Sequence, residues 1–407
     1  MNPRGSSPPK APDVQRAGAV VIDASEVRFD AAVRLEGGRV ASIEPAVGLT
    51  NGERETVLAP GLVNAHAHLD LGIAAAGARG ETFLEWVAAV MEARGGRSPA
   101  EVAEGARAAA DRLLETGTTT VLDIDASGVA GMGLSDSPIR LVSLREVIDG
   151  SPAEGNERTE AALALAREAV AAPVSERRAS GLSPHGVHTV SDVLLGDLAP
   201  LARDVPVATH WAETPEETRW LLEGSGPFAD WLGPSPRSSG AERLRRAGLL
   251  DGTLLVHGNC PAPGELALLA GRGVAVVHCP GSHLFFSRPG FALGDLRAAG
   301  IAVALGTDSA ASNGDLDMRR EMRLARETLG VSGAEAWRMA TEEGARFAPW
   351  AHVTGRLGVG DAGDLVRLRP AQGVAAARRD GDRLLDLLTL SEPAVEEVWV
   401  AGERIEG

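Results

Sequence analysis

Two histidines separated by a single residue carry the clearest chemical signal in this chain. His66 and His68 follow the apolar segment that begins at Leu62. Side chains alternate between the two faces of a β-strand, so these two imidazoles point the same way and can bind one metal ion. The alternative interpretation is a polar turn that follows a buried strand.

Two later polar side chains extend this pattern. His210 lies near the end of the strand-like segment Val205–Glu213, and Asp308 follows the apolar run that begins at Ile301. Histidines and an aspartate that reach one mouth from separate strands are how a barrel builds a hydrolytic metal site. A helix N-cap is the alternative for Asp308. The predicted metal ligands are His66, His68, His210 and Asp308.

A glutamate beside the third histidine has the right chemistry for proton transfer. Glu213 comes three residues after His210, where the strand gives way to a helix. A carboxyl group that does not bind the metal can donate or accept protons. The alternative is a surface glutamate at a helix start, since Thr214 and Pro215 both favour helix initiation. We favour the catalytic role because a hydrolytic metal site needs a proton shuttle.

Four more histidines follow strand-like segments. His257 and His278 each end a segment and could hydrogen-bond an attacking water or a substrate. His185 and His188 come after the fourth segment, where we expect substrate contacts. For each of them a satisfied buried histidine is the alternative. We place His257 with Glu213 and Asp308 among the catalytic groups, and His185, His188 and His278 among the substrate contacts.

The elements that must position these residues alternate between strand and helix, which favours a parallel sheet. Helices are expected at Pro99–Thr116 and Pro215–Glu223, and a Gly/Pro/Ser-rich loop at Gly224–Gly240. Eight alternations indicate a closed (β/α)8 TIM barrel, an α/β fold, rather than an open sheet. The expected strands are Leu62–His66, Thr118–Ile124, Arg140–Val147, Ala179–His185, Val205–Glu213, Thr253–His257, Val274–His278 and Ile301–Asp308.

Short strand-like segments also occur near both ends of the chain. Gly37-Gly38, between two of the N-terminal segments, is a hairpin signal. We predict that both ends together form one small β-sandwich domain. The expected division is a disordered tail at 1–13, β-domain segments at 14–60 and 355–407, and a hydrolase barrel at 61–354.

Composition excludes several other classes of protein. The 407 residues carry a net charge of -16, which argues against a nucleic-acid partner. Two cysteines, Cys260 and Cys279, cannot form a disulfide framework or a thiolate zinc cage. No apolar run approaches the roughly 20 residues of a membrane span. We therefore expect a cytoplasmic protein with a small-molecule substrate and no membrane partner. The subunit count stays open, with a homodimer among the arrangements allowed.

Lysine usage bears on the number of metal ions. Lys10, in the expected tail, is the only lysine in the chain. A carbamylated barrel lysine that bridges two metals is therefore excluded. The simpler expectation is one divalent ion, zinc with iron as the alternative.

Three of these segments resemble motifs of the amidohydrolase superfamily, and the resemblance runs from about Val14 to the C-terminus. Pro60–Leu69 is similar to its first-strand motif, Thr209–Thr214 to its fifth-strand motif and Leu305–Asn313 to its eighth-strand motif. Within the superfamily the chain resembles deaminases of adenine-type nucleosides. These include methylthioadenosine/adenosylhomocysteine deaminases and aminodeoxyfutalosine deaminases. The last group is suggested by Glu213–Glu217 with Gly224–Phe228, and by His278–His283.

The resemblance implies a role for each site residue. The four predicted ligands would hold one zinc or iron ion. Glu213 would protonate the ring nitrogen, His257 and Asp308 would steer the attacking water, and His185 would touch the nucleoside. The chain also departs from the subgroup. Members usually have arginine where Gly281 stands, an aromatic hydroxyl at Phe285 and tyrosine at His188.

The resulting functional hypothesis is a metal-dependent hydrolytic deaminase that releases ammonia from an adenine-type nucleoside, of the aminodeoxyfutalosine kind or related. One alternative is an amidohydrolase that acts on another C–N or C–Cl bond, such as a chlorohydrolase or a guanine or cytosine deaminase. A non-enzymatic alternative is an inactive barrel that serves as a scaffold.

Overall fold

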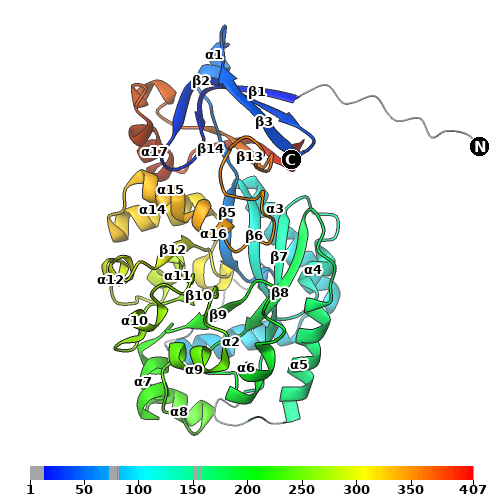
Figure 1. Cartoon of the computed structure of the whole chain (residues 1–407), viewed down its shortest axis with the longest axis vertical. Coiled ribbons are helices and arrows are strands. Elements are labelled where there is room, and N and C mark those ends of the chain that lie inside the picture. Colours follow the sequence, from blue (N-terminus) through cyan, green and yellow to red (C-terminus); the bar gives the residue numbers. More distant parts are fainter. Residues whose placement is uncertain (1–12, 73–79, 81, 151–154, 156, 407) are drawn as a thin grey trace, which may run out of the picture.

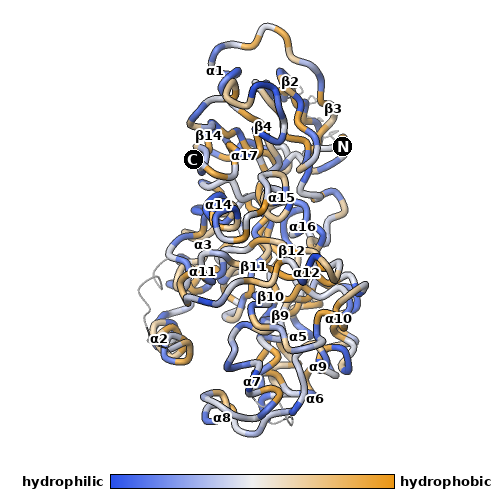
Figure 2. The backbone as a smooth tube through the Cα atoms, turned by 90° about the vertical axis from the view of Figure 1, so that its left-hand side faces the viewer, coloured by the Kyte–Doolittle hydropathy of each residue, from blue (hydrophilic) through white to orange (hydrophobic). Residues whose placement is uncertain are grey.

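The computed structural model describes residues 13–72, 80, 82–150, 155 and 157–406 (Figure 1). The predicted tail lies outside the described residues except for Asp13, which begins the first strand. A strand-rich unit lies at one end of the molecule, and α7 and α8 lie at the opposite end (Figure 2). Within the described part of the chain, no helix combines the length and apolar character needed to cross a bilayer.

Eight parallel strands form the central barrel. Two four-stranded sheets run in the orders β5-β6-β7-β8 and β12-β11-β10-β9. Isolated parallel bridges join them at both edges, Ala67 with Asp308 on one side and Leu182 with Val207 on the other. The ring is thereby closed in chain order, and the predicted TIM barrel is confirmed. Its strands are β5 (Leu62–Ala67), β6 (Thr118–Asp125), β7 (Arg140–Val147), β8 (Arg178–Pro184), β9 (Ala208–Trp211), β10 (Leu254–His257), β11 (Ala275–His278) and β12 (Ala302–Leu305).

Most barrel strands match their expected positions to within a few residues, but β9 is much shorter than the predicted Val205–Glu213. It begins at Ala208 and ends at Trp211. Pro206 lacks the N–H that a central strand needs. Ala212 has φ +52°, which turns the chain out of the extended conformation.

Helices surround the barrel, and local sequence explains where several of them begin. Ser98 caps α3 through a capping box with Glu101. The predicted loop at Gly224–Gly240 is wrong in part, because α8 starts at Pro227 and buries Phe228. The helices are α2 (Phe83–Gly95), α3 (Pro99–Glu115), α4 (Ala130–Gly133), α5 (Glu157–Val170), α6 (Asp192–Leu198), α7 (Pro215–Glu223), α8 (Pro227–Leu232), α9 (Gly240–Ala247), α10 (Glu265–Leu269), α11 (Pro280–Phe285), α12 (Leu293–Ala298), α13 (Ala310–Asn313), α14 (Met318–Leu329), α15 (Gly333–Met339) and α16 (Glu342–Ala345), with the 3-10 turn η1 (Leu69–Leu71).

Strands from both ends of the chain form the second unit, as predicted. They make one continuous seven-stranded sheet in the order β15-β14-β13-β4-β1-β2-β3, which encloses a core that includes Val20, Leu58 and Trp399. Gly37 and Gly38 both have positive φ, as a tight hairpin requires. The elements are β1 (Asp13–Val21), β2 (Val27–Glu36), β3 (Arg39–Pro45), α1 (Asn51–Arg54), β4 (Val57–Pro60), β13 (Leu365–Arg369), η3 (Val374–Ala377), α17 (Gly381–Leu390), β14 (Ala394–Val400) and β15 (Glu403–Arg404). The domain boundaries 60/61 and 354/355 stay predictions.

A buried ion pair joins the barrel to this sheet. Arg140, at the start of β7, is fully buried and donates through Nε and Nη2 to the Asp364 carboxylate at 2.5 and 3.1 Å. Asp364 precedes β13 and also accepts a hydrogen bond from the Ala401 N–H at 2.7 Å. Removal of one partner from such a pair leaves an uncompensated buried charge.

We therefore expect Asp364→Ala to lower the free energy of unfolding by about 3–5 kcal/mol, the usual loss when one member of a buried pair is removed. The midpoint of urea unfolding measures the change. Glu36→Ala is the matched control because its pair with Arg34 lies on the surface, where such pairs contribute about 0–1 kcal/mol. Equal effects of the two substitutions would contradict the structural role of the Arg140–Asp364 pair.

Candidate metal centre and active site

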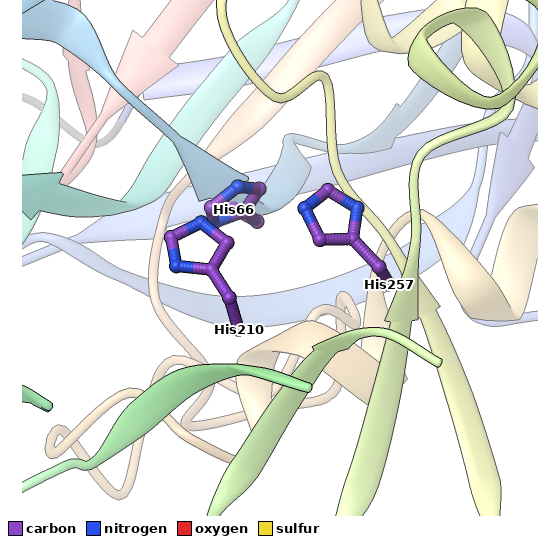
Figure 3. Close-up of side chains that lie close together, drawn as sticks. All are labelled: His66, His210 and His257. Carbon is purple, nitrogen blue, oxygen red and sulfur yellow. The ribbon is translucent and has the colours of Figure 1, made fainter. Parts of the chain in front are cut away.

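Four histidines and one aspartate converge at the carboxyl ends of the barrel strands. His66 lies on β5 and His68 just beyond it, His210 lies on β9, His257 ends β10, and Asp308 follows β12. The Nε2 atoms of His66 and His68 lie 3.5 and 3.8 Å from Asp308 Oδ1. The Nε2 atoms of His68 and His210 are 3.3 Å apart. The rings of His66, His210 and His257 also face one another (Figure 3).

Closure of the barrel brings the aspartate to the first histidine. The Asp308 N–H donates to the His66 carbonyl at 3.0 Å. Beneath this bond, the Asn64 side chain donates to Thr307 Oγ1 at 2.7 Å and accepts from the Thr307 N–H at 3.1 Å. Gly306 permits the approach, because a Cβ there would lie 2.8 Å from the Cβ of His66. These contacts hold the ends of β5 and β12 together at the candidate site.

Three residues at this mouth have an unusual backbone conformation. The φ angles of Ala212, His257 and Asp308 are +52°, +75° and +57°. Non-glycine residues adopt this left-handed conformation rarely, at a cost of about 1–3 kcal/mol each, and such strain clusters at functional sites. At all three positions the chain leaves a strand, and the strain accompanies the projection of functional side chains into the mouth.

Burial sets the charge of the cluster. Desolvation lowers the pKa of His68 and of His257 to about 3, so both imidazoles are neutral near pH 7. Burial alone would raise the pKa of Asp308, but the contact with the His66 ring holds that pKa well below its usual range. Neutral imidazoles and an ionised carboxylate are the forms that bind a cation.

The hydrogen bonds of the histidines fit a metal ion at this position. Nδ1 of His210 donates to the His185 carbonyl, which leaves the Nε2 lone pair directed toward His68. Both ring nitrogens of buried His66 lack a hydrogen-bond partner. A divalent cation would satisfy these nitrogens, and imidazole with carboxylate is a usual ligand set for catalytic zinc. The distinction between the ligand His210 and the water-steering His257 stays a prediction, because the two rings lie similarly close to His66, at 5.2 and 5.6 Å between centroids.

Two serines that the sequence did not single out orient the aspartate. Ser282 Oγ and Ser312 Oγ donate to Asp308 Oδ2 at 2.7 and 2.9 Å, and the Ser309 N–H donates to Oδ1 at 2.8 Å. Both serines fall within segments that carried the family resemblance, which was the one signal that could have identified them. With Oδ2 held in this way, Oδ1 faces His66 and His68.

Glu213 lies beside the histidine cluster in a state suited to proton donation. Its Oε1 is 3.8 Å from His257 Nε2. Burial raises the pKa of Glu213 to about 8; Arg288 opposes this rise, and Asp308 and Glu217 add to it. The carboxyl is therefore largely protonated near pH 7, as a general acid must be.

Two other residues that sequence reasoning missed fix the backbone of Glu213. Fully buried Glu217 accepts hydrogen bonds from the N–H groups of Ala212 and Glu213 at 3.2 and 2.8 Å. The Asn259 side chain donates to the Glu213 carbonyl at 3.1 Å. Glu217 falls within the Glu213–Glu217 segment that carried the family resemblance, but that resemblance assigned no role to it. Asn259 lies in a loop for which no local pattern indicates a contact with Glu213.

The predicted substrate-contact histidines have three different environments. The His185 ring lies 4.9 Å from that of His210, and its Nδ1 is 2.6 Å from Thr189 Oγ1. His188 is buried against Phe228, and its Nδ1 lies 3.7 Å from Glu217 Oε1. His278 stacks on Phe291 at 4.0 Å. The structure thus brings His185 to the cluster and packs the other two rings into neighbouring walls, and substrate contact by all three stays a prediction.

Gly281 stands where members of the similar deaminase subgroup usually have arginine, and the packing around it explains this difference. A Cβ at this position would lie 1.7 Å from Asn313 Oδ1 and 2.8 Å from Glu321 Oε1. The Gly281 N–H donates to Glu321 Oε2 at 2.8 Å. Asn313 and Glu321 therefore fill the space that an arginine side chain would need.

A closed barrel with this ligand set at its carboxyl mouth defines a metal-dependent barrel hydrolase. Residues 57–405 match the model of the amidohydrolase family, and the chain belongs to that family. The expected superfamily resemblance is thereby confirmed, as is a hydrolytic enzyme that acts on C–N bonds other than peptide bonds.

Individual relatives refine this placement. The chain is 33% identical over 346 residues to a 5-methylthioadenosine/S-adenosylhomocysteine deaminase of Halobacterium salinarum, covering 79% of this chain and 76% of that protein. An adenosine deaminase of Xanthomonas campestris with bound zinc superposes with a TM-score of 0.81 at 27% identity, covering 98% and 93% of the two chains. Helicobacter pylori aminofutalosine deaminase, in complex with methylthio-coformycin, superposes with a TM-score of 0.81 at 20% identity. The match covers 97% of this chain and 100% of that chain.

The metal site generates a direct prediction. We expect the purified protein to hold about one divalent ion per chain, and His68→Ala or Asp308→Ala to lose most of it because each removes a ligand atom from a four-ligand set. Elemental analysis by mass spectrometry measures the stoichiometry. His352→Ala is the control, since His352 pairs with Glu176 rather than with the cluster. Full metal content in both site variants would disprove the ligand assignment.

Proposed function

We propose that this chain is a zinc-dependent deaminase that hydrolyses the amino group of an adenine-type nucleoside. The observation that carries the proposal is the Glu213 carboxyl, whose pKa burial raises to about 8, placed 3.8 Å from His257 and beside the cluster of His66, His68 and Asp308. Such a pair of oppositely tuned carboxyl groups is what acid–base hydrolysis requires. The names of the relatives support a nucleoside as the substrate.

The roles of the side chains follow from their positions. His66, His68, His210 and Asp308 would hold the ion, which when bound would lower the pKa of its water to about 7. Asp308, helped by His257, accepts the proton of the attacking water as the new C–O bond forms at the amino-bearing carbon. Glu213 donates its proton to the adjacent ring nitrogen. The C–N bond to the amino group then breaks, and the leaving ammonia takes up the proton that Asp308 had accepted. The hydroxyl proton of the intermediate returns to Glu213 as the carbonyl forms.

The substrate is proposed more finely as an adenine nucleoside with a modified 5′ end, of the aminodeoxyfutalosine or methylthioadenosine/adenosylhomocysteine kind. The segment His278–His283 favours the first, and the Halobacterium relative is named for the second. Zinc is proposed over iron because the Xanthomonas adenosine deaminase carries zinc. A homodimer, a cytoplasmic location and the lack of nucleic-acid or membrane partners stay predictions.

Ammonia release from a panel of nucleosides tests the proposal. The panel contains adenosine, methylthioadenosine, S-adenosylhomocysteine and aminodeoxyfutalosine, with guanine, cytosine and a chlorotriazine as the competing class. Conversion of only the competing compounds would replace the proposed function by the alternative C–N or C–Cl hydrolysis.

Loss of the general acid has a defined kinetic result. We expect Glu213→Gln to lower kcat about 10²–10⁴-fold, the usual contribution of general acid–base catalysis. Metal content should remain at the wild-type level, because the carboxyl is not among the predicted ligands. Steady-state kinetics and elemental analysis on the same sample separate the two effects. An unchanged kcat would remove Glu213 from the mechanism.

The same residue predicts the pH dependence. Because the proton on Glu213 is required and its pKa is raised to about 8, kcat/KM should fall as pH rises through about 8 and the carboxyl ionises. The pH profile of the wild-type enzyme shows this alkaline limb. In Glu213→Gln the residual activity should lack it, since the amide does not titrate. If kcat/KM falls at the same pH in both proteins, the ionisation belongs to another group.

A further inference from the structure

An aromatic wall stands beside the candidate site. It consists of Phe83 and Trp86 on α2 together with Phe285 and Phe286 at the end of α11. The ring of Phe286 lies 5.5 Å from Phe83, 4.9 Å from Trp86 and 4.9 Å from Phe285. The wall joins two segments of the chain that are about two hundred residues apart in sequence.

The guanidinium group of Arg288 lies against this wall. Its central carbon is 5.1 Å from the Phe83 ring centre and 4.8 Å from that of Phe286, within cation–π range. Its Nε and Nη2 atoms are buried and have no hydrogen-bond partner. The indole nitrogen of Trp86 is also buried without a partner. Across the part of the chain that the structure describes, no carboxylate lies within ion-pair distance of Arg288. The wall therefore holds three unpaired donor atoms.

Other arginines in this protein show what the same edge of a guanidinium binds. Arg112 donates through Nε and Nη2 to the two carboxylate oxygens of Asp315 at 2.9 and 2.7 Å. Arg319 uses the same two atoms for Asp317, at 2.9 and 2.6 Å. Two parallel N–H bonds match the planar geometry of a carboxylate. In Arg288 the same two donors, Nε and Nη2, form a buried fork without a hydrogen-bond partner, although buried donors are almost always satisfied.

A chain of short contacts connects Arg288 to the reacting groups. The main-chain N–H of Arg288 donates to the His283 carbonyl at 3.1 Å. His283 Nδ1 lies 3.0 Å from Asn259 Oδ1, and Asn259 donates to the Glu213 carbonyl at 3.1 Å. The positive charge of Arg288 also acts on the pKa values of Glu213 and His257, which it lowers in both cases. These contacts place the loop that carries Arg288 beside the main chain of Glu213.

We propose that Arg288 binds a carboxylate carried by the nucleoside substrate, through the paired N–H groups of Nε and Nη2. This inference rests on the proposed nucleoside deaminase activity and adds a substrate class, an adenine nucleoside with an acidic substituent. The rings of Phe83 and Phe286, which meet at an interplanar angle of 70°, both contact the guanidinium and hold it in one orientation, so little side-chain freedom is lost when the carboxylate binds. The ring faces also exclude water, which strengthens a charged hydrogen bond.

A purely structural role for Arg288 makes a different prediction. If its guanidinium only packs against the rings, then its removal weakens the wall and affects neutral and acidic substrates alike. Recognition of a carboxylate changes the ratio between them. The test therefore compares substrates that differ in one charge.

The experiment uses the metal-loaded full chain with S-adenosylhomocysteine, its carboxamide and methylthioadenosine. We expect Arg288→Gln to lower kcat/KM for S-adenosylhomocysteine about ten- to hundredfold, as loss of a charged bidentate contact does. The change for the carboxamide and for methylthioadenosine should stay within about threefold, because neither offers a carboxylate to the fork. Arg288→Lys, which keeps the charge without the fork, should lie between. Arg297→Gln is the matched control, since Arg297 is exposed and pairs with Glu335.

The outcomes separate this inference from the proposed function. If the wild-type protein releases ammonia from none of these three and from neither adenosine nor aminodeoxyfutalosine, the proposed function fails. If it deaminates them but both Arg288 variants change all three equally, the carboxylate assignment is overturned and Arg288 is structural. A wild-type enzyme that treats the acid and the carboxamide alike, with no change of ratio in either variant, overturns the assignment as well. If Arg288→Gln does not fold, the ratio measured with Arg288→Lys decides.

Discussion

The candidate site depends on one main-chain contact, the hydrogen bond from the Asp308 N–H to the His66 carbonyl where the last barrel strand meets the first. The paired hydrogen bonds of Asn64 with Thr307 support this contact, and Gly306 leaves room for it. Without this closure the carboxylate and the first two imidazoles would belong to opposite edges of an open sheet. With it, the candidate ligand atoms from the ends of β5, β9 and β12 face one small volume, and binding of a cation would offset the cost of burying them.

Burial at the barrel mouth then acts in two opposite directions. Desolvation disfavours whichever form is charged, so it keeps His68 and His257 neutral while it keeps Glu213 protonated. The histidines thereby remain available as ligands or acceptors, and the glutamate remains an acid. Asp308 is the exception, because its contact with the His66 ring and the hydrogen bonds donated by Ser282 and Ser312 favour the ionised form. One low-dielectric environment thus prepares both a metal site and its proton donor.

The residues that we propose for substrate selection are separate from those that we propose to hold the metal. Asn313 and Glu321 occupy the space beside Gly281, where similar enzymes usually have an arginine, and Arg288 presents its charge instead from the aromatic wall of Phe83 and Phe286. A barrel family can keep its reaction and change its specificity in this way, because the loops after the strands vary while the strand ends do not.

The sequence by itself determined the eight strands to within a few residues, the His66/His68 pair and the family, because strand alternation and short motifs are local properties. It did not determine where strand β9 ends or the helix at Pro227, since backbone strain at Ala212 and burial of Phe228 decide these. Nor did it distinguish His185, beside the cluster, from His278, stacked on Phe291, although both follow strands. The roles of Glu217, Asn259, Ser282 and Arg288 emerged only from the tertiary structure, although Glu217 and Ser282 fall within segments that carried the family resemblance. Their partners are set by the packing of loops that meet when the barrel closes, and no local pattern in the sequence specifies those partners.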